Sequence, residues 1–118
     1  MKYILLLGSL LFATEKSIAG VWGEKESSAL KNTYAVFSQK GDSVFMAHYL
    51  EFNGQAFFEQ GKGIRIGDTL KYHVKVIQKI PGWSTAGDHL LVLQADGSLK
   101  GTYSDNLGNT GPLELYRK

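Results

Sequence analysis

Residues 43–66 read SVFMAHYLEFNGQAFFEQGKGIRI, two apolar and aromatic segments separated by Asn53-Gly54. The dipeptide Asn-Gly favours a two-residue hairpin turn, because both central positions of that turn need a positive φ. A two-residue loop also fixes the register of its strands, and here it places His48 opposite Glu59. This stretch therefore predicts a long antiparallel hairpin that carries a histidine and a glutamate on the same face.

Similar turn signals divide the rest of the chain into short segments rich in Val, Ile, Tyr, Phe and Thr. The signals are Lys40-Gly41-Asp42, Gly67-Asp68, Asp96-Gly97 and Gly108-Asn109. We expect eight strands, at residues 20–26, 33–39, 43–52, 55–66, 69–80, 88–95, 98–105 and 111–118. Strands joined by short loops pair antiparallel, and a meander of this many strands closes into a barrel without exposed edges. The predicted fold is all-β: a single antiparallel eight-stranded up-and-down barrel over residues 20–118.

Length and composition exclude several classes of protein. The chain has 118 residues, with 13 Lys and Arg against 11 Asp and Glu, which gives a formal net charge of +2. This length allows one domain, and this charge excludes the strongly basic surface of a nucleic-acid-binding protein. The absence of cysteine excludes disulfides, thiolate zinc sites and cysteine nucleophiles. We expect no nucleic-acid partner, and no motif indicates a cofactor.

The first nineteen residues have the pattern of a secretory signal peptide. Lys2 supplies the initial positive charge, residues 3–13 form an apolar run, and Ser17-Ile18-Ala19 offers small residues at the two positions that signal peptidase reads. The run is shorter than the roughly 20 apolar residues of a membrane-spanning helix. We therefore expect residues 1–19 to be removed, no membrane span, and a mature domain that begins at Gly20. Export without disulfides suits a bacterial periplasm or a secreted protein.

Alternation along each strand assigns side chains to the two faces of the barrel wall. A two-residue loop at Asp96-Gly97 places Leu90 and Val92 inside. The residues expected to face inward are Val44, Met46, His48, Leu50, Phe57, Glu59, Leu70, Tyr72, Val74, Val76, Gln78, Ile80, Leu90, Val92, Leu99, Tyr103, Leu113, Leu115 and Arg117. Those expected to face outward include Phe45, Tyr49, His73, His89, Leu91 and Leu93. Gly61 and Gly63 lie within a strand, where glycine marks a bulge or a close backbone approach.

Several inward side chains are polar, which suggests a ligand site. A small eight-stranded barrel either packs its interior with side chains or holds one small ligand. Ligand pockets are mostly apolar, with a few polar groups that fix the orientation of the ligand. The residues predicted to bind a small, partly apolar ligand are His48, Phe57, Glu59, Tyr72 and Tyr103. The alternative is a structural network of satisfied polar groups at one end of the barrel.

Catalysis and metal binding are less favoured by the sequence. A carboxylate beside an imidazole raises its basicity, so His48 and Glu59 have the composition of an acid–base pair. No serine or threonine lies in a recognisable nucleophile motif. The three histidines do not converge in the predicted register, because His73 and His89 point outward while His48 points inward. We therefore expect neither an enzyme nor a metal site.

Two further features predict contacts with a protein partner. Residues 80–87 form the longest loop, and Trp83 within it either covers the barrel mouth or anchors a partner. Leu91 and Leu93, predicted outside, form an apolar stripe with the character of a subunit interface. A homodimer and a second protein are both compatible with this pattern, and so is a stripe covered by a loop of the same chain.

The two ends of the predicted domain resemble the calycin group of barrels, which includes lipocalins and avidins. Gly20-Val21-Trp22 matches the Gly-x-Trp that opens the first strand in that group, and Arg117 matches the basic residue that covers this tryptophan. Residues 97–109 look like an avidin hairpin, although the tryptophans that bind biotin in avidins are not evident here. The resemblance implies that Trp22 and Arg117 close one end and that a ligand binds in the mouth. Small periplasmic protease inhibitors share this architecture, so a protein-binding module is the alternative function.

Overall fold

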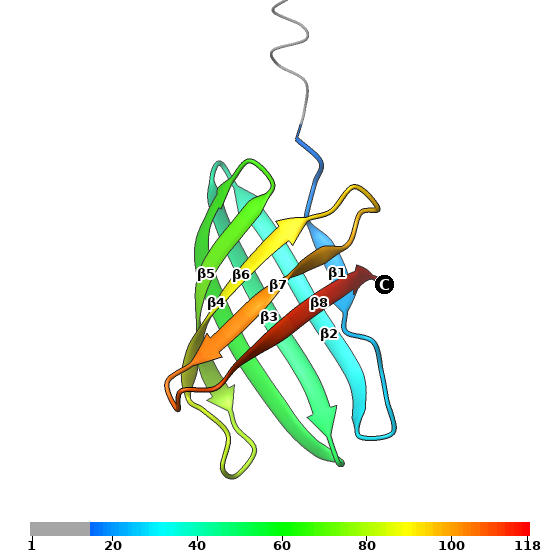
Figure 1. Ribbon diagram of the computed structural model, residues 1–118, viewed down its shortest axis with the longest axis vertical. Helices are drawn as coiled ribbons and strands as arrows, with labels where there is room; N and C mark the ends of the chain where they lie inside the picture. The colour runs from blue at the N-terminus through cyan, green and yellow to red at the C-terminus, as the bar shows by residue number, and fades with distance from the viewer. Residues whose placement is uncertain (1–14) are drawn as a thin grey trace, which may run out of the picture.

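Eight antiparallel strands follow one another around a closed barrel in the computed structural model, which describes residues 15–118 (Figure 1). The strands are β1 (Gly20–Gly23), β2 (Leu30–Lys40), β3 (Ser43–Phe52), β4 (Gln55–Ile66), β5 (Thr69–Gln78), β6 (Ala86–Leu93), β7 (Leu99–Asp105) and β8 (Thr110–Arg117). The barrel closes where β1 pairs with β8, with Trp22 opposite Arg117. The predicted all-β up-and-down barrel is therefore confirmed. Within residues 15–118, no helix has the length and apolar character needed to cross a membrane.

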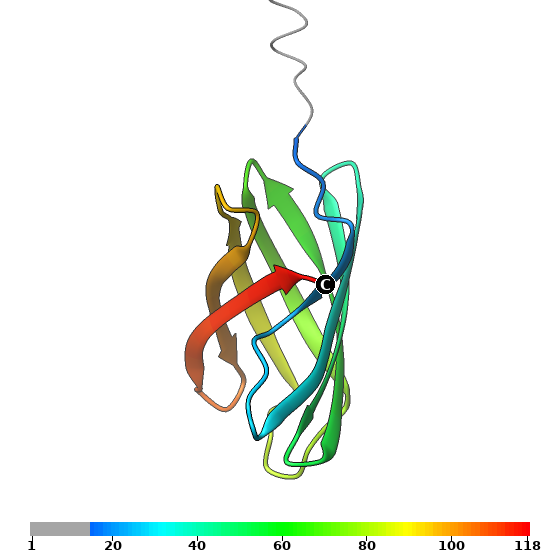
Figure 2. The ribbon, with the colours of Figure 1, turned by 90° about the vertical axis from the view of Figure 1, so that its right-hand side faces the viewer.

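The connections alternate between the two ends of the barrel (Figures 1 and 2). The β2–β3, β4–β5 and β6–β7 loops lie at one end, together with residues 15–19, and β8 runs toward this end. We call this the closed end, because Ile18 and Trp22 fill it. The other four loops surround the open end, near Glu24, His48 and Trp83.

The hairpin of β3 and β4 has the register that the sequence predicts. His48 pairs with Glu59, and the two residues of the turn have φ angles of 50° at Asn53 and 77° at Gly54. Both values are positive, as a turn with two left-handed central residues requires. This turn aligns the histidine and the glutamate inside the barrel.

The two glycines in β4 mark a close approach. A Cβ at Gly61 would lie 2.8 Å from Cδ2 of Tyr72, and one at Gly63 would overlap the backbone of Lys71 and Tyr72. Glycine at these positions allows the Tyr72 side chain to lie across the inner face of β4. The register shift between β4 and β5 lies elsewhere, between Phe58 and Glu59.

The closed half of the barrel contains the larger apolar core. Its members are Ile18, Trp22, Ala35, Phe37, Val44, Met46, Leu70, Tyr72, Val74, Leu91, Leu93, Leu99, Leu113 and Leu115. Trp22 is completely buried and donates its indole N–H to the carbonyl of Ile18 at 2.9 Å. The guanidinium carbon of Arg117 lies 4.2 Å from the centre of the Trp22 ring. Arg117 pairs with Trp22 and has the same strand parity as the buried Leu113 and Leu115, so it lies on the inner face as predicted. It is exposed because it covers the tryptophan at the end of the barrel, next to solvent.

Residues 15–19 pack against the closed end. Ile18 is completely buried, and the carbonyls of Lys16 and Ala19 accept hydrogen bonds from Arg65 and Arg117 at 2.7 and 2.6 Å. The first fourteen residues of the predicted signal peptide lie outside the described residues. Cleavage after Ala19 would remove Ile18, a core side chain.

The inward face of β6 differs from the prediction by one residue. Leu91 and Leu93 are buried, whereas Leu90 and Val92 are 44% and 38% exposed. The β6–β7 loop explains the difference. The backbone N–H of Gly97 donates to the carbonyl of Gln94 at 2.9 Å, and the backbone N–H of Gln94 donates to the carbonyl of Ser98 at 2.8 Å. This is a three-residue loop, with Gly97 at a φ of 90°.

The corrected register changes two other predictions. His89, predicted outside, is buried, and it pairs with Tyr103 across β6 and β7. The predicted outer stripe of Leu91 and Leu93 is therefore part of the core.

A separate register shift affects the end of β5. Gln78, predicted inside, is exposed because the shift at Phe58 rotates the end of this strand.

Candidate functional site

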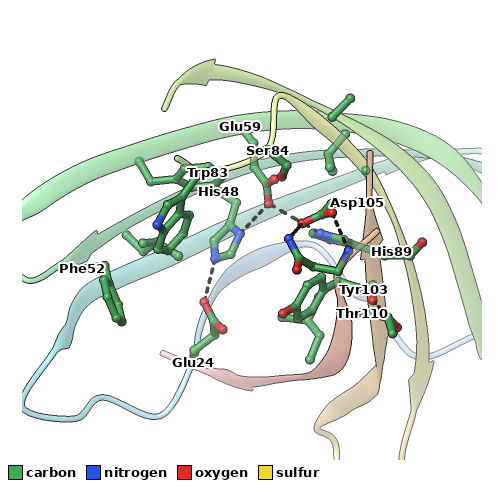
Figure 3. A pocket seen from close by; sticks show the side chains of 18 of the residues that line it. Glu24, His48, Phe52, Glu59, Trp83, Ser84, His89, Tyr103, Asp105 and Thr110 are labelled. Carbon is green, nitrogen blue, oxygen red and sulfur yellow. Dashed lines mark hydrogen bonds and ion pairs between the residues drawn. The ribbon is translucent and has the colours of Figure 1, made fainter. Parts of the chain in front are cut away.

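A pocket of about 580 Å³ occupies the open half of the barrel (Figure 3). One wall consists of aromatic and aliphatic side chains, and the other carries carboxylates, histidines and hydroxyls. The lining residues are Glu24, Leu30, His48, Leu50, Phe52, Phe57, Glu59, Val74, Gly82, Trp83, Ser84, Ala86, Gly87, His89, Tyr103, Ser104, Asp105, Asn109, Thr110 and Leu113. This volume falls within the range of pockets that hold small organic molecules.

His48 forms the centre of the polar wall. It extends from β3, and its Nδ1 lies 2.9 Å from Oε2 of Glu59 on β4. Its Nε2 lies 3.1 Å from Oε2 of Glu24, in the loop after β1. Carboxylate oxygens accept hydrogen bonds, so the ring donates from both nitrogens and is an imidazolium.

The electrostatic surroundings of His48 favour its protonated form. Burial disfavours the charge and lowers the pKa, but the hydrogen bonds and negative charges of Glu24 and Glu59 outweigh burial and raise the pKa of His48 to about 9. The ring is therefore charged at neutral pH, in agreement with its two donor bonds.

Glu24 is held in place by its backbone. The N–H of Glu24 donates to the hydroxyl of Thr33 at 2.8 Å, and that hydroxyl donates to the carbonyl of Glu24 at 3.1 Å. Thr33 is completely buried in β2, so this exchange fixes the chain where it leaves β1. The Glu24 side chain, 21% exposed, extends from this point to His48 at the rim of the pocket.

A second histidine, on β6, reaches the same glutamate. Nδ1 of His89 lies 2.8 Å from the hydroxyl of Tyr72, and Nε2 lies 3.6 Å from Oε2 of Glu59. Burial lowers the pKa of His89, against the opposing effect of the Glu59 charge, so the neutral ring is favoured. Burial and the nearby negative charges of Glu59 and Glu24 hold the pKa of Tyr72 well above its usual range. Tyr72 therefore keeps its proton, and its hydroxyl can donate a hydrogen bond to Nδ1 of a neutral His89.

Trp83 and two phenylalanines form the apolar wall. The Trp83 ring centre lies 5.4 Å from that of Phe52 and 5.2 Å from that of Phe57. The β5–β6 loop turns at Gly82, whose φ is 86°. The backbone N–H of Trp83 donates to the carbonyl of Ile80 at 2.9 Å. Trp83 is half-buried, so one part of the indole packs on the barrel and the rest lines the pocket.

Asp105 and Tyr103 complete the rim on β7. Asp105 accepts hydrogen bonds from the backbone N–H groups of Leu107 and Asn109, both at 2.9 Å. Burial raises the pKa of Asp105, but these bonds and the Asn109 side chain outweigh burial and lower the pKa below its usual value. The half-buried Tyr103 packs against the closed-half core and faces the pocket.

Four of the five predicted ligand-binding residues line this pocket: His48, Phe57, Glu59 and Tyr103. Tyr72 lies behind the lining and contacts His89. Trp83, predicted to cover the mouth or to anchor a partner, is part of the pocket wall.

Sequence reasoning missed Glu24 and His89. Glu24 has the same strand parity as Trp22, so extending the alternation by two residues would have placed it inside. His89 required the longer loop at Gly97. Within residues 15–118, no three histidine, aspartate or glutamate side chains form a group suited to a metal ion. Comparison of the chain with protein-family models, curated proteins and solved structures found no match.

Proposed function

We propose that the protein binds a small, partly apolar molecule in the pocket at the open end of the barrel. The observation that carries this proposal is a cavity of about 580 Å³ that is lined by both aromatic and polar side chains. The aromatic wall provides the apolar area that stabilises a bound molecule, and the polar wall orients it. Binding in the mouth agrees with what the resemblance to calycins implies.

The arrangement of His48 favours binding over catalysis. Both of its ring nitrogens are hydrogen-bonded to carboxylates, at 2.9 and 3.1 Å. A general base needs an unprotonated nitrogen within reach of the substrate proton. The imidazolium therefore acts as a fixed positive charge that holds two carboxylates in position.

Native mass spectrometry of the protein, purified from cells and compared with its denatured mass, tests the proposal. We expect a mass excess in the range of a small organic molecule that is lost on denaturation. A protein-sized adduct or a doubled mass would instead support the protein-binding alternative or a homodimer. The denatured mass also tests the proposed export, because removal of a signal peptide shortens the chain.

Replacing Trp83 with Ala tests whether the retained molecule lies in this pocket. We expect Trp83→Ala to lose it, because the indole forms the wall with Phe52 and Phe57. Leu107→Ala is the matched control, since Leu107 is an exposed apolar residue of another loop at the same end and does not line the pocket. Retention in Trp83→Ala would contradict binding at this site.

A further inference from the structure

The charges around the pocket differ from those of the whole chain. The chain has a formal net charge of +2, yet the described residues that line the pocket include no lysine or arginine. They do include three carboxylates, on Glu24, Glu59 and Asp105. The basic side chains of β5, such as Lys71 and Lys75, are exposed on the outer wall instead.

The hydrogen bonds of His48 set the balance of charge inside. This ring supplies one positive charge, because it donates to two carboxylates. Burial favours the neutral form of His89 by lowering its pKa, and its Nδ1 lies 2.8 Å from the Tyr72 hydroxyl, placed to accept a hydrogen bond. Three negative charges therefore face one positive charge. Water is partly excluded between the walls of a cleft, so this excess acts strongly on a ligand inside.

The carboxylates also retain capacity to accept hydrogen bonds. Glu24 and Glu59 both use Oε2 in their contacts with His48. Among residues 15–118, no hydrogen bond engages Oε1 of either one. A carboxylate oxygen has two lone pairs, so each glutamate can accept from a donor on a ligand.

The aromatic side chains of the pocket also suit a positively charged ligand. Trp83, Phe52 and Phe57 line the same cavity as the carboxylates, and Figure 3 shows Trp83 and Phe52 beside His48 and Glu24. Aromatic faces attract cations and also pack against apolar groups. An anionic head group, such as that of a fatty acid, would meet two unbalanced negative charges.

We infer that the ligand is a small amphipathic cation, a protonated amine carried on an apolar body. This inference rests on the proposed binding function. The ammonium group lies among Glu24, Glu59 and Asp105, and donates to the carboxylate oxygens. The apolar body lies against Trp83 and the two phenylalanines.

Three probes that share one apolar part but differ in head group test which charge the pocket prefers. They are 4-phenylbutylamine, 4-phenylbutan-1-ol and 4-phenylbutyrate, which are cationic, neutral and anionic at neutral pH. Isothermal titration calorimetry gives their affinities for the full chain, and NMR shifts of pocket residues locate them. We expect the amine to bind at least about tenfold more tightly than the alcohol, and the carboxylate to bind most weakly.

A pair of neighbouring glutamates provides the matched variants. Glu24→Gln removes one carboxylate at the pocket rim and should reduce the advantage of the amine over the alcohol by about tenfold. Glu26→Gln removes a carboxylate two residues away that is 3.6 Å from Lys118 and does not line the pocket. We expect the Glu26 variant to bind the amine more tightly than the alcohol by the same factor as the unchanged protein.

The possible outcomes separate the two proposals. Equal affinity for the amine and the alcohol, with both lost in Trp83→Ala, would overturn the cationic ligand and leave the binding function intact. Tightest binding of the carboxylate would also overturn the cationic ligand. If no probe shifts pocket resonances at millimolar concentration, the proposed binding function itself is overturned.

Discussion

Trp22 and Trp83 lie at opposite ends of the same barrel and have opposite surroundings. Trp22 is completely buried, donates a hydrogen bond to Ile18 and lies under the Arg117 guanidinium. Trp83 is half-buried and faces a cavity that carboxylates also line. An eight-stranded barrel has an interior that side chains can fill or that one small ligand can occupy. This barrel does the first at its closed end, and we propose that it does the second at its open end.

The largest expected effect contrasts the two tryptophans in stability. Trp22→Ala leaves a cavity in the main core and should lower the free energy of unfolding by about 3–5 kcal/mol. Trp83→Ala should cost about 1 kcal/mol, since it removes aromatic contacts from a half-buried side chain. Urea unfolding of both variants measures the difference. Equal losses would mean that the open end contributes as much to the core as the closed end.

Next in size is the contribution of residues 15–19 to the closed end. Ile18→Ala removes a completely buried side chain and should cost about 2–5 kcal/mol. Leu107→Ala, at an exposed position of the open end, should leave the free energy of unfolding nearly unchanged. Thermal or urea unfolding compares the two. An Ile18 variant as stable as the Leu107 variant would show that these residues are dispensable for the fold.

The two Asx-Gly turns show how far the register could be predicted from sequence. Asn53-Gly54 forms the expected two-residue turn, so His48 and Glu59 meet as predicted. Asp96-Gly97 carries a similar signal but forms a three-residue loop. The longer loop buries Leu91 and Leu93, which the predicted register left in water. Packing of the whole barrel decided between two turns that local sequence alone could not distinguish.

The same reasoning explains which parts of the candidate site could be found. The pairing of His48 on β3 with Glu59 on β4 could be predicted from one turn and from strand alternation. Glu24 and His89 come from two other places in the chain, and their approach to Glu59 depends on barrel closure and on the β6 register. The packing of Ile18 was also unexpected, because an apolar residue beside small ones has the pattern of a cleavage site.

The two buried histidines predict a stability maximum near pH 6.5. The pKa of His48 is raised from 6.5 to about 9, so its contribution is complete below pH 6.5 and is lost as the pH rises through 9. One pKa unit corresponds to about 1.4 kcal/mol, so this loss is on the order of 3 kcal/mol. The pKa of His89 is lowered, so its contribution is present above pH 6.5 and is lost as the pH falls. Urea unfolding from pH 5 to 10 measures the free energy of unfolding on the acid limb and on the alkaline limb of this maximum.

Histidine variants assign the alkaline limb. His48→Gln should abolish the loss of stability between pH 6.5 and 9, because glutamine does not titrate. His73→Gln should retain it, since His73 is exposed on the outer wall, where it pairs with Asp88 at 3.1 Å. An unchanged alkaline limb in His48→Gln would contradict the charged state of the ring.

The smallest effect compares two neighbouring cations that each lie over an aromatic ring. Arg117 lies 4.2 Å from the buried Trp22 ring and donates to the carbonyl of Ala19 at 2.6 Å. Lys118 lies 4.1 Å from the ring of Tyr34, which is exposed. A cation–π contact is stronger where water is excluded, so Arg117→Ala should cost about 1–2 kcal/mol and Lys118→Ala about 0.5 kcal/mol. Urea unfolding of both variants at neutral pH measures the costs. Equal costs would mean that Arg117 contributes only as a surface charge, and that the packing of Ile18 and Trp22 closes the barrel without it.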